Sequence, residues 1–292
     1  MKFEGILPAL ITPLREDETV NTEVLHQLVG DLLTRGVDGF YIGGATGEGL
    51  ALKTAQRMIL AEEAIHAIDG RKPAIVQVAA ANFGDAVALA QHAERVGADA
   101  ISATAPLFFH YDRQDVYNYY KALAESVHIP LMIYYSPAAN FPMDAQFAAR
   151  MFAVDNITAI KWTSSNYYEM VKLKDMTHGE MNIMNGPDEM LLMGLSAGAD
   201  GGIGSTYNIM PERIKAIYTA FRSGDMAAAR EHQTQADRVI AQILQWKVIP
   251  AVKVVLEAMG YNVGNASFPM TRYTDAEKQE IIAAVKNAGL MN

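Results

Sequence analysis

The chain contains 292 residues, half of them hydrophobic, and its formal net charge at pH 7 is -9. This length suits one large α/β domain or two smaller ones, and the negative charge argues against a nucleic-acid-binding surface. The absence of cysteine excludes disulfide bonds, thiolate zinc sites and cysteine nucleophiles. The N-terminal residues do not form a signal peptide, and no apolar run is long enough to span a membrane, so we expect a cytoplasmic protein without a membrane partner.

Short apolar segments alternate with amphipathic segments through residue 221. We expect strands at residues 6–11, 37–42, 74–79, 98–103, 131–135, 157–160, 182–185 and 200–204. We expect helices at residues 22–35, 54–68, 85–96, 115–127, 144–152, from 166 onward, 189–195 and 211–221. Eight strand-then-helix units predict a parallel sheet closed into a (β/α)₈ TIM barrel. An open, doubly wound sheet is the alternative, but it needs a Gly-rich turn after the first strand, which residues 11–14 do not provide.

The strand pattern ends at Ser223 and Gly224. Three helical segments follow, at residues 225–245, 251–259 and 275–288. We therefore expect residues 1–224 to form a catalytic barrel and residues 225–292 to form a C-terminal helical extension packed on it.

Residues 157–164 place a lysine, Lys161, at the end of an expected buried strand. Asn166 followed by Glu169 has the spacing of a capping box and predicts the start of the next helix. Burial of the lysine amine favours its neutral, nucleophilic form, which can attack a ketone and form a Schiff base. A lysine that extends from the strand end into solvent is the alternative that this segment by itself leaves open.

The active site of a (β/α)₈ barrel lies at the carboxyl ends of its strands. Uncommon residues collect at five of these expected ends, in segments 43–48, 134–137, 161–163, 185–189 and 202–206. The backbone N–H groups of residues 43–48 can hold an anion such as a carboxylate, although a tight turn also needs glycines. Tyr134 is a candidate general acid/base or a packing residue. Asp188 and Glu189 either cap a helix or bind sugar hydroxyls.

Histidines and clustered aromatic residues are two further possible sources of function in this sequence. The seven histidines show no metal-ligand spacing, so a metal-dependent aldolase is not supported and we expect no metal site. The aromatic residues between Phe108 and Tyr120 indicate packing or a subunit interface.

Together these motifs resemble the N-acetylneuraminate lyase and dihydrodipicolinate synthase superfamily of Schiff-base aldolases, over nearly the whole chain. The resemblance is specific at segments 43–48, 134–137, 161–164 and 197–208. The last of these, and Asn185-Gly186-Pro187-Asp188-Glu189, are especially similar to the N-acetylneuraminate lyase branch. The other branch usually has an arginine shortly after the strand-five proline, where this chain has Ala138-Ala139-Asn140.

The resemblance implies a cycle in which Lys161 attacks the C2 ketone of a 2-oxo acid and loses water to form an imine. The protonated imine allows the C3–C4 bond to break, and the resulting enamine becomes pyruvate. No cofactor is implied beyond this covalent lysine imine. Tyr134 would move the proton to and from the C4 hydroxyl. The family also implies a homotetramer.

The resemblance also assigns substrate-binding roles. The backbone N–H groups of Ala45 and Thr46, with the Thr46 hydroxyl, would hold the carboxylate. The remaining hydroxyls would be held by Thr163, Gly186, Asp188, Glu189 and Ser205.

The chain departs from the family pattern at Ala45, where most relatives have Ser or Thr, and at Phe108, where many have a tyrosine donated across a subunit interface. Both hydroxyls normally link to the strand-five tyrosine in a proton relay.

Taken as a whole, the resemblance implies a class I aldolase that cleaves or forms a 2-oxo sugar acid, with N-acetylneuraminate as the first candidate. The alternatives are an aldolase for another 2-oxo-3-deoxy sugar acid and a non-catalytic binder of pyruvate or a sugar acid.

Overall fold

Eight parallel strands form the centre of the molecule in the computed structural model, which describes residues 2–137 and 141–291. The strands are β1 Gly5–Pro8, β2 Phe40–Ile42, β3 Ala74–Gln77, β4 Ala100–Thr104, β5 Leu131–Tyr135, β6 Ile157–Trp162, β7 Asn182–Asn185 and β8 Gly201–Gly204. Their order in the sheet is β1-β8-β7-β6-β5-β4-β3-β2. A parallel bridge between Ala9 and Tyr41 joins the two end strands, so the predicted (β/α)₈ barrel is confirmed.

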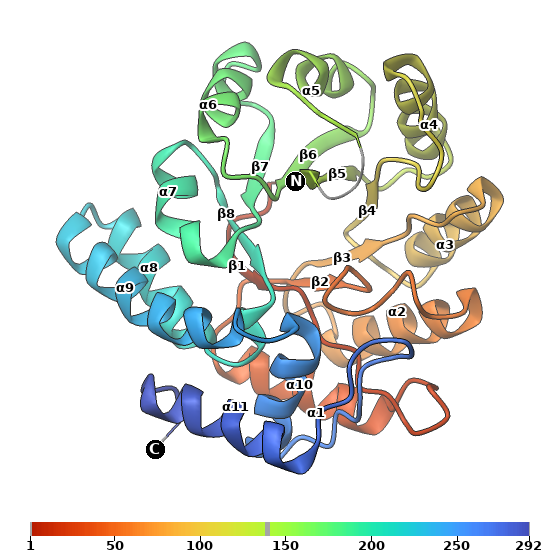
Figure 1. Cartoon of the computed structure of the whole chain (residues 1–292). Coiled ribbons are helices and arrows are strands. Elements are labelled where there is room, and N and C mark those ends of the chain that lie inside the picture. The colour runs from red at the N-terminus through yellow and green to blue at the C-terminus, as the bar shows by residue number, and fades with distance from the viewer. Residues whose placement is uncertain (1, 138–140, 292) are drawn as a thin grey trace.

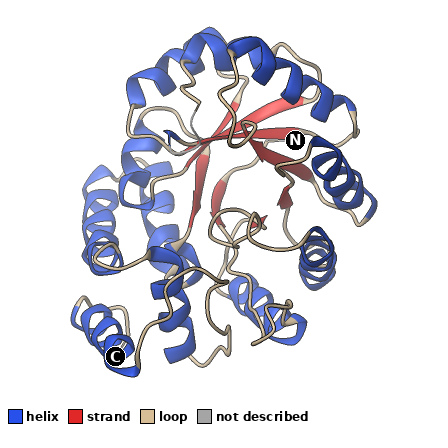
Figure 2. Cartoon of the chain, turned by 45° about the vertical axis from the view of Figure 1, so that its right-hand side comes forward, coloured by secondary structure: helices blue, strands red, loops and turns tan. Residues whose placement is uncertain are grey.

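Helices surround this ring of strands on the outside (Figures 1 and 2). In chain order they are α1 Thr22–Thr34, α2 Thr54–Ile68, α3 Phe83–Arg95, α4 Arg113–Glu125, α5 Ala145–Phe152, α6 Tyr167–Met176, α7 Leu191–Ser196 and α8 Pro211–Arg222. Two 3₁₀ helices, η2 Asp188–Met190 and η3 Thr206–Asn208, follow β7 and β8. Figure 1 shows the three later helices, α9 Met226–Ile243, α10 Val248–Ala258 and α11 Asp275–Asn287, on one side of the barrel.

Side chains alternate along the strands between two apolar cores. The inner core fills the barrel and contains Leu7, Tyr41, Ile75, Ala100, Met132, Ala159, Met184 and Ile203. The larger outer core lies between the strands and the helices and includes Ile6, Ile42, Ile101, Ile133 and Ile160. Because the barrel interior is packed, polar groups that serve a ligand must lie at its ends.

The start of α6 differs in one detail from the prediction. The Asn166 side chain accepts a hydrogen bond from the Glu169 N–H, so Asn166 is the predicted cap. The reciprocal half of a capping box is absent from the bonds of these two residues: the Glu169 carboxylate accepts from the N–H of Ala145 at 2.8 Å and pairs with Lys172 at 2.6 Å. The Glu169 carboxylate thus bonds to Ala145 and Lys172 and not to the backbone of Asn166.

None of the helices within residues 2–137 and 141–291 is by itself long and apolar enough to cross a membrane. Helices α9 and α10 together meet the length and composition criteria, but the pair is bent by 107°.

Candidate active site

Lys161 lies in β6 with only 5% of its surface exposed. The strand continues to Trp162, two residues past the predicted end, so Lys161 is its penultimate residue. In the sheet Lys161 is aligned with Tyr134 of β5 and Met184 of β7. Its Nζ atom lies 4.2 Å from the ring centroid of Tyr134 and 4.9 Å from that of Tyr41. The amine therefore lies between two aromatic rings at the carboxyl end of the barrel, a largely desolvated place for a nucleophile.

The turn after β2 presents free hydrogen-bond donors. Among the residues described by the structure, none accepts a hydrogen bond from the N–H of Ala45 or of Thr46. The Thr46 hydroxyl lies 2.7 Å from the Ser205 hydroxyl, which follows β8, so the bond joins two distant segments at this end of the barrel. Thr46 is buried and Ala45 is exposed. Two unpaired N–H groups next to two hydroxyls form a suitable site for a carboxylate.

Glycines make this turn possible. Gly43 has φ of 66°, in the left-handed region. A Cβ atom at Gly49 would lie 1.9 Å from the carbonyl oxygen of Gly43, and one at Gly47 would lie 2.7 Å from that of Leu10. The backbone is therefore packed too closely for side chains at these positions.

Asp188, in η2, lies between the ends of β7 and β8. Its Oδ2 atom accepts hydrogen bonds from the N–H of Thr206 at 2.8 Å and from the Thr206 hydroxyl at 2.7 Å. Burial raises the pKa of Asp188 to about 6, against the opposing effect of these two hydrogen bonds. The Oδ1 atom faces Gly204, where a Cβ would lie only 2.2 Å away. One carboxylate oxygen thus holds η3 through Thr206, the other packs against the Gly204 backbone, and Asp188 also lines a cavity.

Four more of the predicted binding residues line the same cavity as Asp188. The cavity has a volume of about 460 Å³, and these residues are Thr163, Gly186, Glu189 and Ser205. Thr163 presents a buried Oγ1 atom that has no hydrogen-bond partner among the described residues. Glu189 is exposed, in contrast to its buried neighbour Asp188. Lys161 and Tyr134 are not among the lining residues, whereas Thr163, two residues after Lys161, is one of them.

The C-terminal helices contribute apolar residues to the lining of this cavity. They are Ile240, Ile243, Leu244 and Val248. A ligand in the cavity thus meets both hydroxyl or carboxylate groups and aliphatic side chains.

The structure adds three residues that the sequence reasoning missed. Tyr41 lies inside the barrel and donates a hydrogen bond from its hydroxyl to Ser102 Oγ at 2.9 Å. Thr104 is aligned with Tyr134 in the sheet, and its buried hydroxyl has no partner among the described residues. The sequence does contain an indication for two of them: Ser102 and Thr104 are polar residues two positions apart, and so on the same face, at the end of an otherwise apolar strand.

Phe108 is 87% exposed, and its backbone has φ of 76°. Its ring centroid lies 5.2 Å from that of Phe109, which is itself 68% exposed. Within one chain, then, Phe108 belongs to an exposed aromatic pair. The segment Ala138-Ala139-Asn140, which lacks the arginine of the other branch, lies outside the described residues.

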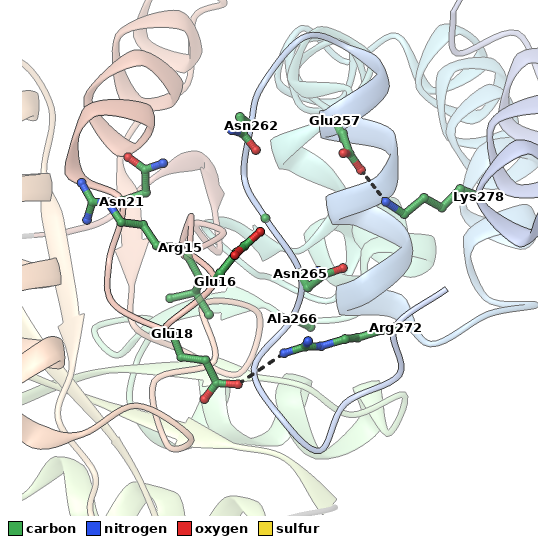
Figure 3. Close-up of a pocket in the computed structure, with 12 residues that line it drawn as sticks. Arg15, Glu16, Glu18, Asn21, Glu257, Asn262, Asn265, Ala266, Arg272 and Lys278 are labelled. Atoms are coloured by element: carbon green, nitrogen blue, oxygen red, sulfur yellow. Dashed lines mark hydrogen bonds and ion pairs between the residues drawn. The ribbon is translucent and has the colours of Figure 1, made fainter. Parts of the chain in front are cut away.

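A larger cavity, of about 600 Å³, lies between the loop after β1 and the segment that connects α10 to α11 (Figure 3). Four of its six charged side chains form two ion pairs: Arg272 lies 3.7 Å from Glu18, and Lys278 lies 3.1 Å from Glu257. None of the predicted site residues lines it. We therefore place the candidate active site at the smaller cavity. Over the described ranges, no group of three or more His, Asp or Glu side chains is arranged to hold a metal ion.

Comparison with known proteins shows the family of the chain. The model of the dihydrodipicolinate synthetase family matches residues 2–288. The N-acetylneuraminate lyase of Rhizobium meliloti (strain 1021) is 33% identical over 288 residues, which is 99% of this chain and 95% of that protein.

Two solved structures are similar over their whole length. The N-acetylneuraminate lyase of Proteus mirabilis superposes with a TM-score of 0.95 at 27% identity, covering 100% of both chains. The Clostridium difficile protein CdNal, in complex with mannosamine, gives a TM-score of 0.95 at 29% identity, covering 99% of this chain and 100% of the other. The chain therefore belongs to the dihydrodipicolinate synthetase family and is a carbon–carbon lyase of the pyruvate-dependent class I aldolase type.

Proposed function

We propose that this aldolase cleaves, or forms, N-acetylneuraminate through a Schiff base on Lys161. The observation that carries the proposal is the position of the Lys161 amine, which is buried in β6 and lies 4.2 Å from the ring centroid of Tyr134. The relatives named N-acetylneuraminate lyase support the choice of substrate, as does the mannosamine bound to the Clostridium difficile protein. Mannosamine is the N-deacetylated form of N-acetylmannosamine, which is the aldehyde product of such a cleavage.

The chemistry follows from the positions of the two residues. The Lys161 amine adds to the C2 ketone, and loss of water gives a protonated imine. Tyr134 gives its proton to the departing hydroxyl, which leaves as water, and the resulting phenolate removes the proton of the C4 hydroxyl. The C4 oxygen then forms an aldehyde while the C3–C4 electron pair passes into the imine as an enamine. Tyr134 then returns its proton to C3, and hydrolysis of the imine releases pyruvate and regenerates the amine. The protons balance without a cofactor or a metal.

The substrate carboxylate is held by the N–H groups of Ala45 and Thr46 and by the Thr46 hydroxyl. This role is supported by the absence of other partners for these two N–H groups among the described residues. The polyol chain occupies the 460 Å³ cavity, where Thr163, Asp188, Glu189 and Ser205 provide polar contacts. Gly186 also lines the cavity, and its lack of a side chain lets Thr163 pack directly against it. The aliphatic wall from α9 and α10 suits the methyl group of an N-acetyl substituent.

A second substrate class is favoured by a specific observation. Ala45 and Phe108 lack the hydroxyls that relatives use in a proton relay, and Phe108 is exposed in the single chain. An aldolase for another 2-oxo-3-deoxy sugar acid is therefore the alternative. We further propose a cytoplasmic homotetramer, in which the exposed Phe108–Phe109 pair is covered by another subunit.

Borohydride reduction in the presence of pyruvate tests the central proposal. We expect one reduced pyruvyl group per chain, located on Lys161 by peptide mass mapping. Lys161→Met should lose both the adduct and turnover while retaining its circular dichroism spectrum. Lys174→Met is a matched control, because Lys174 is also largely buried but pairs with Asp200 at the other end of the barrel. An adduct on another lysine, or none, contradicts the mechanism.

A further inference from the structure

A buried ion pair connects the C-terminal helices to the turn that follows β2. Glu48 is the last residue of this turn, and Lys253 lies in α10. The Lys253 Nζ atom is 2.6 Å from Glu48 Oε1, and the two side chains are 2% and 0% exposed. Such pairs are retained only where their geometry and additional hydrogen bonds compensate for the loss of water.

Those additional bonds all come from the segment between α10 and α11. Glu48 Oε2 accepts from the N–H of Ser267 at 2.6 Å and from the Ser267 hydroxyl at 2.8 Å. The Lys253 amine also donates to the carbonyl of Asn265 at 3.0 Å. Residues separated by more than two hundred positions are therefore joined in one buried network.

The backbone of Glu48 shows that this network acts on the turn itself. Its φ is 57°, in the left-handed region that side-chain-bearing residues rarely adopt. The Glu48 N–H donates to the carbonyl of Ala45 at 3.0 Å, so the strained residue closes the turn containing the free N–H groups. A conformation of this kind persists when surrounding contacts determine it.

We propose that Glu48 and Lys253 are positioning residues, which fix the turn so that the N–H groups of Ala45 and Thr46 face the substrate carboxylate. This proposal rests on the proposed function. It also gives residues 225–292 a defined role: the extension completes the site and acts with the barrel of residues 1–224 as one catalytic unit.

Lys253 contributes in two ways. Its ion pair holds the Glu48 side chain and, through it, the backbone of the turn. Its positive charge also neutralises the Glu48 carboxylate, which would otherwise be an uncompensated negative charge buried in the same turn that receives an anionic substrate. Loss of the lysine should thus weaken carboxylate binding more than loss of both charges together.

Pyruvate titrations with borohydride trapping measure this effect. For Lys253→Met we expect the pyruvate concentration at half-maximal trapping to rise by about tenfold to a hundredfold, since small displacements of positioning groups have effects of this size. The limiting trapping rate at saturating pyruvate should change by less than about threefold, because Lys161 and Tyr134 are untouched. The double variant Glu48→Gln with Lys253→Met removes the uncompensated charge and should recover most of the affinity.

Lys174→Met is the matched control. Its amine pairs with Asp200 at 2.9 Å and donates to the carbonyl of Met181 at 3.0 Å, so it has the same two kinds of partner as Lys253. Asp200 lies at the amino end of β8, away from the turn. Lys174→Met should lower the melting temperature without changing the half-saturating concentration of pyruvate.

Ser267→Ala keeps the proposal testable if Lys253→Met does not fold, because it removes only one hydrogen bond to Glu48. We expect it to raise the half-saturating concentration several-fold. Unchanged half-saturation in both variants, with lowered melting temperatures, would overturn the positioning role. That outcome differs from failure of the proposed function, in which the wild-type chain itself forms no pyruvyl adduct on Lys161.

Discussion

Tyr134 and Lys161 are directly aligned between β5 and β6, and the Lys161 amine lies 4.2 Å from the centre of the Tyr134 ring. Parallel neighbouring strands bring residues 27 positions apart into contact at one end of the barrel. The alignment places the Tyr134 phenol beside the Lys161 amine, which is the nucleophile of the proposed cycle.

The first prediction concerns Asp188 and pH. Burial raises its pKa from 3.8 to about 6, so protonation below pH 6 removes a charged acceptor from the polyol cavity. We expect KM for the sugar acid to rise as the pH falls from 7 to 5. Asp188→Asn should raise KM about tenfold or more at pH 7, since a hydrogen bond to a charged group contributes about 1.5–3 kcal/mol, and should lose this pH dependence. Steady-state kinetics across the pH range measure both effects.

The stability of the fold should also depend on the protonation of Asp188, but in the opposite direction: a lower pH should weaken substrate binding and stabilise the folded protein. Because the folded-state pKa is raised, the folded protein binds the proton more tightly than the unfolded chain. This contribution to the free energy of unfolding is fully present below about pH 4 and is lost as the pH rises through about 6. Urea unfolding of wild type and Asp188→Asn at several pH values checks the sign. Thr206→Val serves as the control that removes one hydrogen bond to Asp188 but keeps the carboxylate.

The second prediction concerns the hydroxyl pair of Thr46 and Ser205, whose oxygens are 2.7 Å apart. Thr46→Val keeps the shape of the side chain and removes its hydroxyl, so we expect the half-saturating pyruvate concentration to rise roughly tenfold. Ser205→Ala should have a smaller effect. The two changes should be non-additive, because each hydroxyl orients the other. Additive effects in a double-mutant cycle would mean that the pair does not act as one unit in carboxylate binding.

The third prediction concerns the relay hydroxyls that the chain lacks. Ala45 is exposed, so Ala45→Ser should not reduce stability. If N-acetylneuraminate is the substrate, Ala45→Ser combined with Phe108→Tyr should raise kcat on it, because both hydroxyls act through Tyr134. Kinetics of the four members of this cycle on N-acetylneuraminate and on a panel of 2-oxo-3-deoxy acids provide the measurement. No gain on N-acetylneuraminate, with high activity on another acid, would favour the alternative substrate class.

The fourth prediction concerns stability at the amino end of the barrel. Buried Asn182 accepts a hydrogen bond from the Phe3 N–H at 2.9 Å and donates to the Phe3 carbonyl at 2.9 Å. Asn182→Ala leaves both backbone groups buried without these partners and should lower the free energy of unfolding by about 2–5 kcal/mol. Below the melting temperature, kcat and KM should be unchanged, because Asn182 begins β7 at the end opposite to the site. A raised KM would show that this end of the barrel also shapes the active site.

The sequence by itself determined the architecture and the order of its elements. Strand and helix patterns arise from local periodicity, so the eight units and the three later helices were predicted to within a few residues. The nucleophile candidate was also visible, because a charged residue such as Lys161 near the end of an apolar strand is unusual wherever it occurs. Local signals did not determine where Glu169 bonds: its carboxylate reaches Ala145 in place of the predicted capping partner.

Only the tertiary structure decided which distant groups share the site. Three features join segments that are far apart in the chain. Thr46 bonds to Ser205, Asp188 bonds to Thr206 and also lines the cavity, and aliphatic residues of α9 and α10 line the same cavity. From their sequence, residues 225–292 are expected to be only a helical extension, because their helical pattern contains no catalytic motif. Folding brings Lys253 against Glu48, since closure of the barrel places the turn after β2 next to α10. The spacing of residues along the chain predicts helices and strands, but it does not predict which distant segments come into contact when the chain folds.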